Sequence, residues 1–227
     1  MSAIAPVHAQ AKPARLPVHA SGVFINASGD LLTALHAVAD CSAIYAVKDG
    51  RVVSATVLAS DATQDLAVLR TAFKPYLSAV FPDTQDAARR SQGVFAEGYN
   101  ELQDMPARGR TLFNAMTVPS ENGLSLISAV RPGASGSPVL GANGLVLGVV
   151  VARVAADGNP SGRVELSQAR KAGTGEATRV KAAEADGISS FLRSHGIEHA
   201  RSDLPQLGPM QAQAPRAVTL SAGVICG

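Results

Sequence analysis

The sequence predicts an all-β protein in which antiparallel strands form a sandwich or a barrel. Short apolar runs alternate along the chain with Gly, Asn, Asp and Pro at intervals of about 8–12 residues, as in those folds. Tight turns are expected where glycine accompanies Asn or Asp between two apolar runs, at 26–30 (NASGD), 48–50 (KDG) and 141–144 (GANG). Helical spacing of apolar residues is clear only in 186–196, so helices are a minor part of the predicted fold.

The expected strands form two groups along the chain. In order, these groups are 21–35, 42–60 and 65–73, then 93–100, 124–130 and 137–154. A polar segment, PDTQDAARRSQ at 82–92, separates the groups and is the best candidate for an internal boundary. The chain is therefore expected to fold as two β-rich halves of similar size.

The remaining segments are more polar. The stretch 155–186 is expected to form a long exposed hairpin, and 204–215, rich in Pro and Gln, an extended tether. Residues 216–227 have the apolar character of a strand. The helix predicted at 186–196 takes Asp186 as its N-cap and ends at a glycine.

Composition excludes several classes of function. Of the 227 residues, 46% are hydrophobic and 17% charged, which is close to the average of soluble globular domains. The net charge is only +2 and the basic residues are scattered, so a nucleic-acid partner is not expected. The longest apolar run, 144–152, is far shorter than the roughly 20 residues of a membrane-spanning helix.

The amino terminus and the two cysteines each leave two interpretations open. Ala9-Gln10-Ala11 has the form of a leader cleavage site, but an ordinary flexible, Ala-rich start fits equally well. Cys41 and Cys226 could form one disulfide or remain buried thiols, and neither lies in a metal-ligand pattern. A disulfide would imply an oxidising compartment. No metal site is predicted.

Ser135 is the first candidate for chemistry. It lies in RPGASGSPVL, where Gly133 and Gly136 allow the backbone to curl and aim the N–H groups of Gly133 and Ser135 at one point. A serine nucleophile needs such donors for the oxyanion, and a base to take its proton. Glycine-serine turns are also common as plain structure, so the possible partners decide between the two interpretations.

His36 and Asp65 are the candidate partners. Among the five histidines, only His36 directly follows a β-rich run, in LLTALHAVADC. Asp65 heads an apolar strand, where a buried carboxylate is costly without a partner such as an imidazole. The order His36, Asp65, Ser135 differs from the Ser-Asp-His order of α/β-hydrolases and the Asp-His-Ser order of subtilisins.

Three stretches of the sequence resemble trypsin-like, chymotrypsin-fold serine proteases, in particular the bacterial HtrA/Deg-type peptidases. SGVFINASGDLLTALHAVADC is similar to the family's histidine region, DATQDLAVLR to its aspartate region, and ISAVRPGASGSPVLGANGLVLGVV to its serine region. The resemblance covers about residues 20–196. It implies two antiparallel six-stranded β-barrels with a short C-terminal helix, and a triad in the cleft between them. The implied divisions are a flexible segment 1–19, a first barrel 20–82, a linker 83–91, a second barrel 92–197, and an extended tail 198–227 with a possible terminal strand.

The resemblance also implies the chemistry. His36 would act as general base and then acid, Asp65 would orient it, and Ser135 would form the acyl-enzyme, with the oxyanion bound by Gly133 and Ser135. The substrate would be a protein or peptide, and no cofactor would be needed. Ser137 aligns two residues past the nucleophile and is expected to be a turn residue. Ala129, six residues before Ser135, is the substrate-pocket candidate, and it favours a small or aliphatic P1 side chain.

The sequence departs from the family in several places. Ala134 replaces the aspartate that pairs with a new amino terminus in vertebrate-type trypsins, so no activation of that kind is expected. The strand at 144–154 lacks the serine that supports the triad aspartate in trypsins. About 30 residues follow the resemblance, which are too few for a PDZ domain. The family's usual setting suggests a periplasmic or secreted protein. The alternative function is a protease-fold binding or scaffold protein without catalytic activity.

Overall fold

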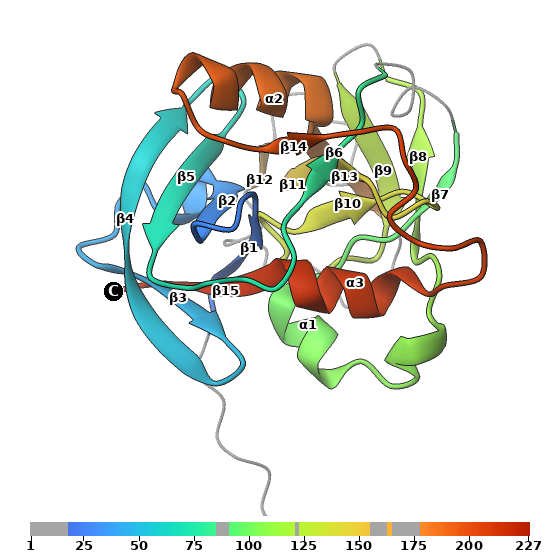
Figure 1. The fold of residues 1–227 in the computed structure, drawn as a ribbon, viewed down its shortest axis with the longest axis horizontal. Coiled ribbons are helices and arrows are strands. Elements are labelled where there is room, and N and C mark those ends of the chain that lie inside the picture. The colour runs from blue at the N-terminus through green and yellow to red at the C-terminus, as the bar shows by residue number, and fades with distance from the viewer. Residues whose placement is uncertain (1–17, 85–90, 121–122, 155–162, 165–177) are drawn as a thin grey trace, which may run out of the picture.

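The computed structural model describes residues 18–84, 91–120, 123–154, 163–164 and 178–227. They form two barrel-like β-sheets, one closed and one nearly closed, with few helices, which confirms the predicted fold class. Figure 1 shows the two sheets side by side, with helices above and below them. One hydrophobic core, which includes Val23, Phe81, Phe95 and Leu140, extends from the first barrel into the second.

The first barrel is closed, with the strand order β1-β15-β3-β4-β5-β2. Its strands are β1 (Ala20–Phe24), β2 (Asp30–Ala34), β3 (Ile44–Lys48), β4 (Arg51–Asp61), β5 (Leu66–Thr71) and β15 (Ser221–Cys226). The turn predicted at 48–50 joins β3 to β4 through Asp49 and Gly50, whose φ angles are 49° and 77°. Positive φ at both central residues is what a two-residue hairpin of type I′ requires.

The second barrel is a sheet of order β10-β11-β13-β9-β8-β7, with β12 paired to β11. Its strands are β7 (Gly93–Val94), β8 (Ala115–Val118), β9 (Leu124–Ser128), β10 (Pro138–Leu140), β11 (Val146–Val154), β12 (Arg163–Val164) and β13 (Thr178–Glu184). Hydrogen bonds in both directions between Phe95 and Leu140, of 2.9 and 2.8 Å, bring the two ends of this sheet together. They leave the barrel nearly closed.

The exposed hairpin predicted at 155–186 is wrong for its last part. β13 lies inside the sheet between β9 and β11, and Val180, Ala182 and Ala183 are buried. The strand consists mostly of alanines and three charged residues, so its local hydrophobicity does not predict a buried strand. The ranges 155–162 and 165–177 of the same prediction lie outside the described residues.

The C-terminal segment returns to the first barrel. β15 is inserted between β1 and β3, so the predicted range 20–82 supplies five of that barrel's six strands and the chain end supplies the last. The tether expected over 204–215 and the strand expected from 216 are both wrong where α3 (Gln213–Leu220) forms. The helix buries Ala214, Ala217 and Leu220, whose spacing of three residues puts them on one face. That face packs into the shared core.

Lys48 fixes the end of α3 against the first barrel. Its ammonium group donates hydrogen bonds to the carbonyls of Val218, Thr219 (3.2 Å) and Ser221 (2.9 Å). A cation at the C-terminus of a helix satisfies carbonyls that have no partner inside the helix. The barrel hairpin therefore holds the helix that leads into β15.

Two further helices flank the sheets. The helix predicted at 186–196 is confirmed as α2 (Ala185–Ser194), which lies above the barrels in Figure 1. Its N-cap is Glu184, two residues earlier than the predicted Asp186. α1 (Tyr99–Asp104) was not predicted, and it occupies the end of a segment expected to be a strand. No described helix has the length and apolar character needed to cross a membrane.

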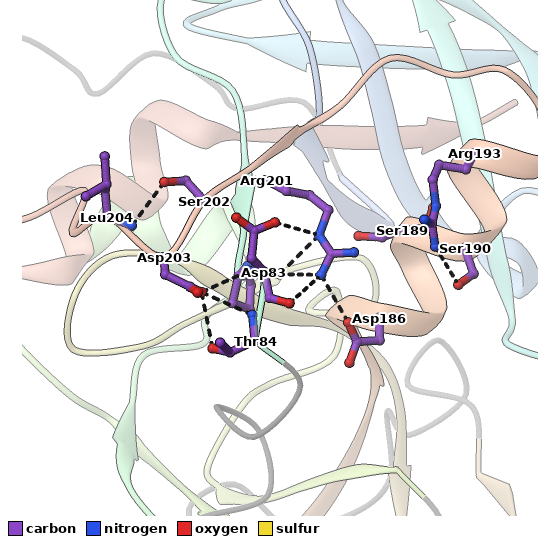
Figure 2. Close-up of polar contacts among 11 residues, drawn as sticks. Asp83, Thr84, Asp186, Ser189, Ser190, Arg193, Arg201, Ser202, Asp203 and Leu204 are labelled. Carbon is purple, nitrogen blue, oxygen red and sulfur yellow. Dashed lines mark hydrogen bonds and ion pairs between the residues drawn. The ribbon is translucent and has the colours of Figure 1, made fainter.

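Polar contacts join the segment that leaves the first barrel, residues 80–84, to the segment that follows the second barrel, residues 200–203. Two short strands pair in parallel there, β6 (Val80–Phe81) and β14 (Ala200–Arg201). Figure 2 shows the Arg201 guanidinium between Asp83 and Asp186, with an Nη2 to Asp186 Oδ1 distance of 3.3 Å. The Asp203 carboxylate accepts the N–H groups of Asp83 and Thr84 at 2.9 and 3.1 Å. These hydrogen bonds lower the pKa of Asp203, so it is charged when the contact forms.

Candidate active site

The first barrel positions His36 and Asp65 at adjacent strand ends. His36 lies in the 3-10 turn Leu35–Ala37 that directly follows β2, and Asp65 precedes β5, the neighbouring strand. Asp65 has a φ of 57°, in the left-handed region that Asp tolerates better than most residues. Its carbonyl accepts the Leu35 N–H at 3.0 Å, which ties the two strand ends together.

Asp65 orients the imidazole of His36. The distance from Asp65 Oδ2 to His36 Nδ1 is 2.7 Å, and Asp65 Oδ1 accepts the main-chain N–H of His36 at 2.9 Å. A carboxylate in this position favours the tautomer with a proton on Nδ1, which leaves Nε2 free to accept one. The side chains are only 9% (His36) and 12% (Asp65) exposed, so this pair is largely shielded from water.

The second barrel brings Ser135 to the other side of the imidazole. Ser135 lies in the turn between β9 and β10 and is 2% exposed. Its Oγ is 3.1 Å from His36 Nε2, which is within hydrogen-bond reach. The structure thus unites the three residues singled out from the sequence, His36, Asp65 and Ser135, although two barrels contribute them.

The turn around Ser135 presents free N–H groups. Gly133 and Gly136 have φ angles of 95° and 86°, which glycine adopts without strain. The N–H of Ala134 donates to Arg131 and that of Gly136 donates to Val150. Among the described residues, no acceptor binds the N–H of Gly133 or of Ser135. These two donors are the ones that the sequence assigns to an oxyanion.

The other predicted residues lie farther from this arrangement. Ala129 is exposed one residue beyond the end of β9, and its part in substrate choice stays a prediction. Ser137 is fully buried and donates its N–H to Ala134 at 2.9 Å, as a turn residue does. The structure joins Cys41 to Cys226 in a disulfide, which connects the loop after His36 to the end of β15. In the described part of the chain, no three His, Cys, Asp or Glu side chains are grouped as metal ligands.

Sequence reasoning missed Ser21 and Thr33, which support the Ser135 turn from the first barrel. The N–H of Ser21 donates to the Ser135 carbonyl at 2.8 Å, and Thr33 Oγ1 donates to the Ser21 carbonyl at 2.7 Å. Both side chains are fully buried. A small polar residue inside an apolar strand is the available signal, because a buried hydroxyl needs a partner.

Comparison with known proteins shows the family of this chain. The sequence profile described as "Trypsin-like peptidase domain" matches residues 20–149, which is more than half of the chain and contains His36, Asp65 and Ser135. The chain belongs to the trypsin-like peptidase family. The resemblance inferred from the sequence motifs is therefore confirmed.

Two proteins that are similar to this trypsin-like chain are longer than it is. An uncharacterized protein, y4bJ, of Sinorhizobium fredii (strain NBRC 101917 / NGR234) is 27% identical over 214 residues, which cover 91% of this chain and 32% of that protein. The solved structure titled "HtrA-type protease AlgW with decapeptide" shares 23% identity with a TM-score of 0.54, over 81% of this chain and 53% of that one. The chain thus spans about a third of one relative and about half of the other, and the second likeness shows a shared fold.

Proposed function

We propose that this trypsin-like protein is a serine endopeptidase that hydrolyses peptide bonds through an acyl-enzyme. One observation carries the proposal: the ring of His36 contacts Asp65 Oδ2 at 2.7 Å and Ser135 Oγ at 3.1 Å at the same time. A base that is oriented on one side and bonded to a hydroxyl on the other is the arrangement that activates a serine.

The first half of the proposed reaction acylates the enzyme. Ser135 Oγ attacks the carbonyl carbon of the peptide as its proton moves to His36 Nε2, and the carbonyl oxygen becomes an oxyanion held by the N–H groups of Gly133 and Ser135. The imidazolium is stabilised by Asp65. His36 then gives the proton to the leaving amine nitrogen, the C–N bond breaks, and the acyl group remains on Ser135.

The second half releases the acid. Water attacks the acyl carbon and gives a proton to His36, the bond to Ser135 Oγ breaks, and the proton returns to that oxygen. General acid–base catalysis of this kind contributes about 10²–10⁴-fold in rate, and each oxyanion donor about 10²–10³-fold. The chain's own residues can supply both contributions.

Substrate class and location belong to the same proposal. Ala129 carries no charge, which favours a small or aliphatic P1 side chain over Lys or Arg. The Cys41–Cys226 disulfide suits an oxidising compartment, so we place the protein in the periplasm or outside the cell. A binding protein without activity would gain nothing from an oriented His36 beside Ser135, and no contact among the residues that the structure describes favours that alternative.

A reporter-tagged fluorophosphonate tests the proposal, because it forms a stable adduct with an activated serine. We expect the wild type to be labelled and Ser135→Ala to be unlabelled with an unchanged thermal unfolding midpoint. Ser137→Ala is the matched control, since it removes a buried hydroxyl two residues away that does not contact His36, and it should be labelled normally. Labelling that survives in Ser135→Ala, or an unlabelled wild type, would overturn the proposal.

A further inference from the structure

Ser21 links the first barrel to the turn that carries the proposed nucleophile. It lies on β1, opposite Gly223 of β15, and its side chain is fully buried. Apart from Ser21, β1 consists of Ala, Gly, Val and Phe. A buried hydroxyl in such a strand stabilises the protein only through its hydrogen bonds, so those bonds indicate what it does.

The Ser21 hydroxyl bridges two segments of the second half of the chain. Its Oγ donates to the Gly133 carbonyl at 2.7 Å and accepts the N–H of Tyr99 at 2.8 Å. The same residue donates its main-chain N–H to the Ser135 carbonyl at 2.8 Å. Ser21 therefore binds the carbonyls on both sides of Ala134, and it also holds the first residue of α1.

These bonds control the direction of the oxyanion donors. The Gly133 carbonyl belongs to the peptide group between Gly133 and Ala134, and the donor N–H groups of Gly133 and Ser135 belong to the peptide groups on either side of it. Gly133 has no side chain to restrict its backbone angles, and its φ is 95°. Without an external partner for its carbonyl, rotation about Gly133 would turn a donor away from the oxyanion.

The surroundings keep Ser21 itself in place. Its carbonyl accepts the Thr33 hydroxyl at 2.7 Å, and β1 is paired on one side with β2 and on the other with β15. A Cβ added to Gly98 would lie 3.4 Å from backbone atoms of Gly133 and Ala134, so the α1 end of the bridge lies beside the same turn. Strand pairing in the first barrel thus fixes the position of the Ser21 hydroxyl, and the hydroxyl in turn binds the Ser135 turn of the second barrel.

We infer that Ser21 is a positioning residue that keeps the oxyanion donors of Gly133 and Ser135 directed at the reacting carbonyl, acting from the opposite barrel. This inference rests on the proposed function. The role of Ser21 is distinct from proton transfer, because none of the hydrogen bonds that Ser21 forms reaches His36 or Asp65. Loss of the hydroxyl should therefore slow the chemical step without disturbing the contacts of His36 with Asp65 and Ser135.

The test compares Ser21→Ala with Thr71→Val in fluorophosphonate labelling. The Thr71 hydroxyl is the matched control, since it is also buried in the first barrel, donates to a carbonyl (Gly29, 2.7 Å) and accepts an N–H (Phe73, 3.2 Å). For Ser21→Ala we expect the maximal labelling rate to fall about 10- to 100-fold, somewhat less than loss of a donor itself. The half-saturating probe concentration and the midpoint of the pH profile should stay unchanged. Thr71→Val should keep the wild-type rate while losing a similar amount of thermal stability.

Each other outcome has a defined meaning. A wild-type rate in Ser21→Ala, or equal slowing in both variants, overturns the positioning role while the hydrolase proposal stands. A wild type that is not labelled overturns the hydrolase proposal and this inference with it. Should Ser21→Ala fail to fold, Ser21→Cys keeps the side-chain size and a weak S–H donor, and its rate should lie between zero and that of the wild type. A Ser21→Cys rate equal to the wild-type rate would then count against the inference.

Discussion

Asp65 binds His36 at two points, with Oδ2 at 2.7 Å from the ring Nδ1 and Oδ1 at 2.9 Å from the main-chain nitrogen. The main-chain contact places the residue and the ring contact sets its tautomer. The trypsin-type support from a serine on the strand 144–154 is absent in the sequence. In this chain the 3-10 turn of His36 itself supplies an N–H donor to the carboxylate.

Asp65→Asn should separate these two roles. Its side-chain oxygen can still accept the His36 N–H, so the fold should survive. Its amide nitrogen would face Nδ1 and donate to it, which leaves the proton on Nε2, where it blocks transfer from Ser135. We expect the labelling rate near neutral pH to fall about 10³–10⁴-fold. A rate within a few-fold of the wild type would show that the ring contact is not needed.

Gly136→Ala should disrupt the junction between the barrels. A Cβ at Gly136 would overlap the Ser21 carbonyl oxygen and crowd Thr33 Oγ1, and the φ of 86° disfavours any side chain. We expect loss of labelling together with a lower unfolding midpoint. Gly50→Ala is the control, because its φ is 77° but nothing lies within 4 Å of the added carbon. That variant should lose about 1–2 kcal/mol of stability from the backbone alone and keep its labelling rate.

Removing the disulfide should destabilise the first barrel. The bond between Cys41 and Cys226 closes a loop across a sequence separation of 185 residues and anchors β15, the last strand of that barrel. Paired replacement by Ala should lower the free energy of unfolding by about 2–5 kcal/mol. Thermal unfolding with and without a reductant measures this, and mass spectrometry of the intact chain shows the bond. An unfolding midpoint that does not respond to a reductant able to break the bond would contradict the prediction.

Glu97 should make stability depend on pH. Burial raises the pKa of its carboxyl, a change that its hydrogen bonds from Gly98 and Asn114 only partly oppose. Between the ordinary glutamate pKa and the raised folded value, the folded protein binds more protons than the unfolded chain. The stability contributed by Glu97 is therefore present at low pH and lost as the pH rises through this window.

Glu97→Gln removes that dependence. Compared with the wild type, the variant should unfold at a higher temperature at about pH 8, and the difference should shrink at about pH 4, where free glutamate is largely protonated. Thermal unfolding at both pH values measures the effect. A variant that is less stable than the wild type at the higher pH would mean that the charged carboxylate is favoured where it lies.

Local features of the chain were predictable because their causes are local. The Asp49-Gly50 hairpin follows from two residues that tolerate positive φ, and α2 follows from the spacing of Ile188, Phe191 and Leu192. The candidate residues were also predictable, since a serine between glycines and a carboxylate heading an apolar strand each have a short-range signature.

Long-range pairing had no such signature. The sequence of α3 predicts the end of a tether and the start of a strand, because the helix buries only two alanines and a leucine in the shared core. These residues become apolar contacts only when that core lies against them. β13 carries Arg179 and Lys181 among alanines and reads as exposed until β9 and β11 pair with it on either side.

The sequence by itself determined the fold class, the order of His36, Asp65 and Ser135, and the glycines that shape the nucleophile turn, because residue type and near-neighbour spacing suffice for these. Only the tertiary structure decided that the chain end completes the first barrel and that Ser21 holds the carbonyls beside Ser135. A strand pairs with whichever edge the whole fold presents to it, and a buried hydroxyl bonds to whatever the packing brings within 3 Å of it. Neither the pairing of β15 nor the hydrogen bonds of Ser21 can be predicted from the residues next to them in the sequence.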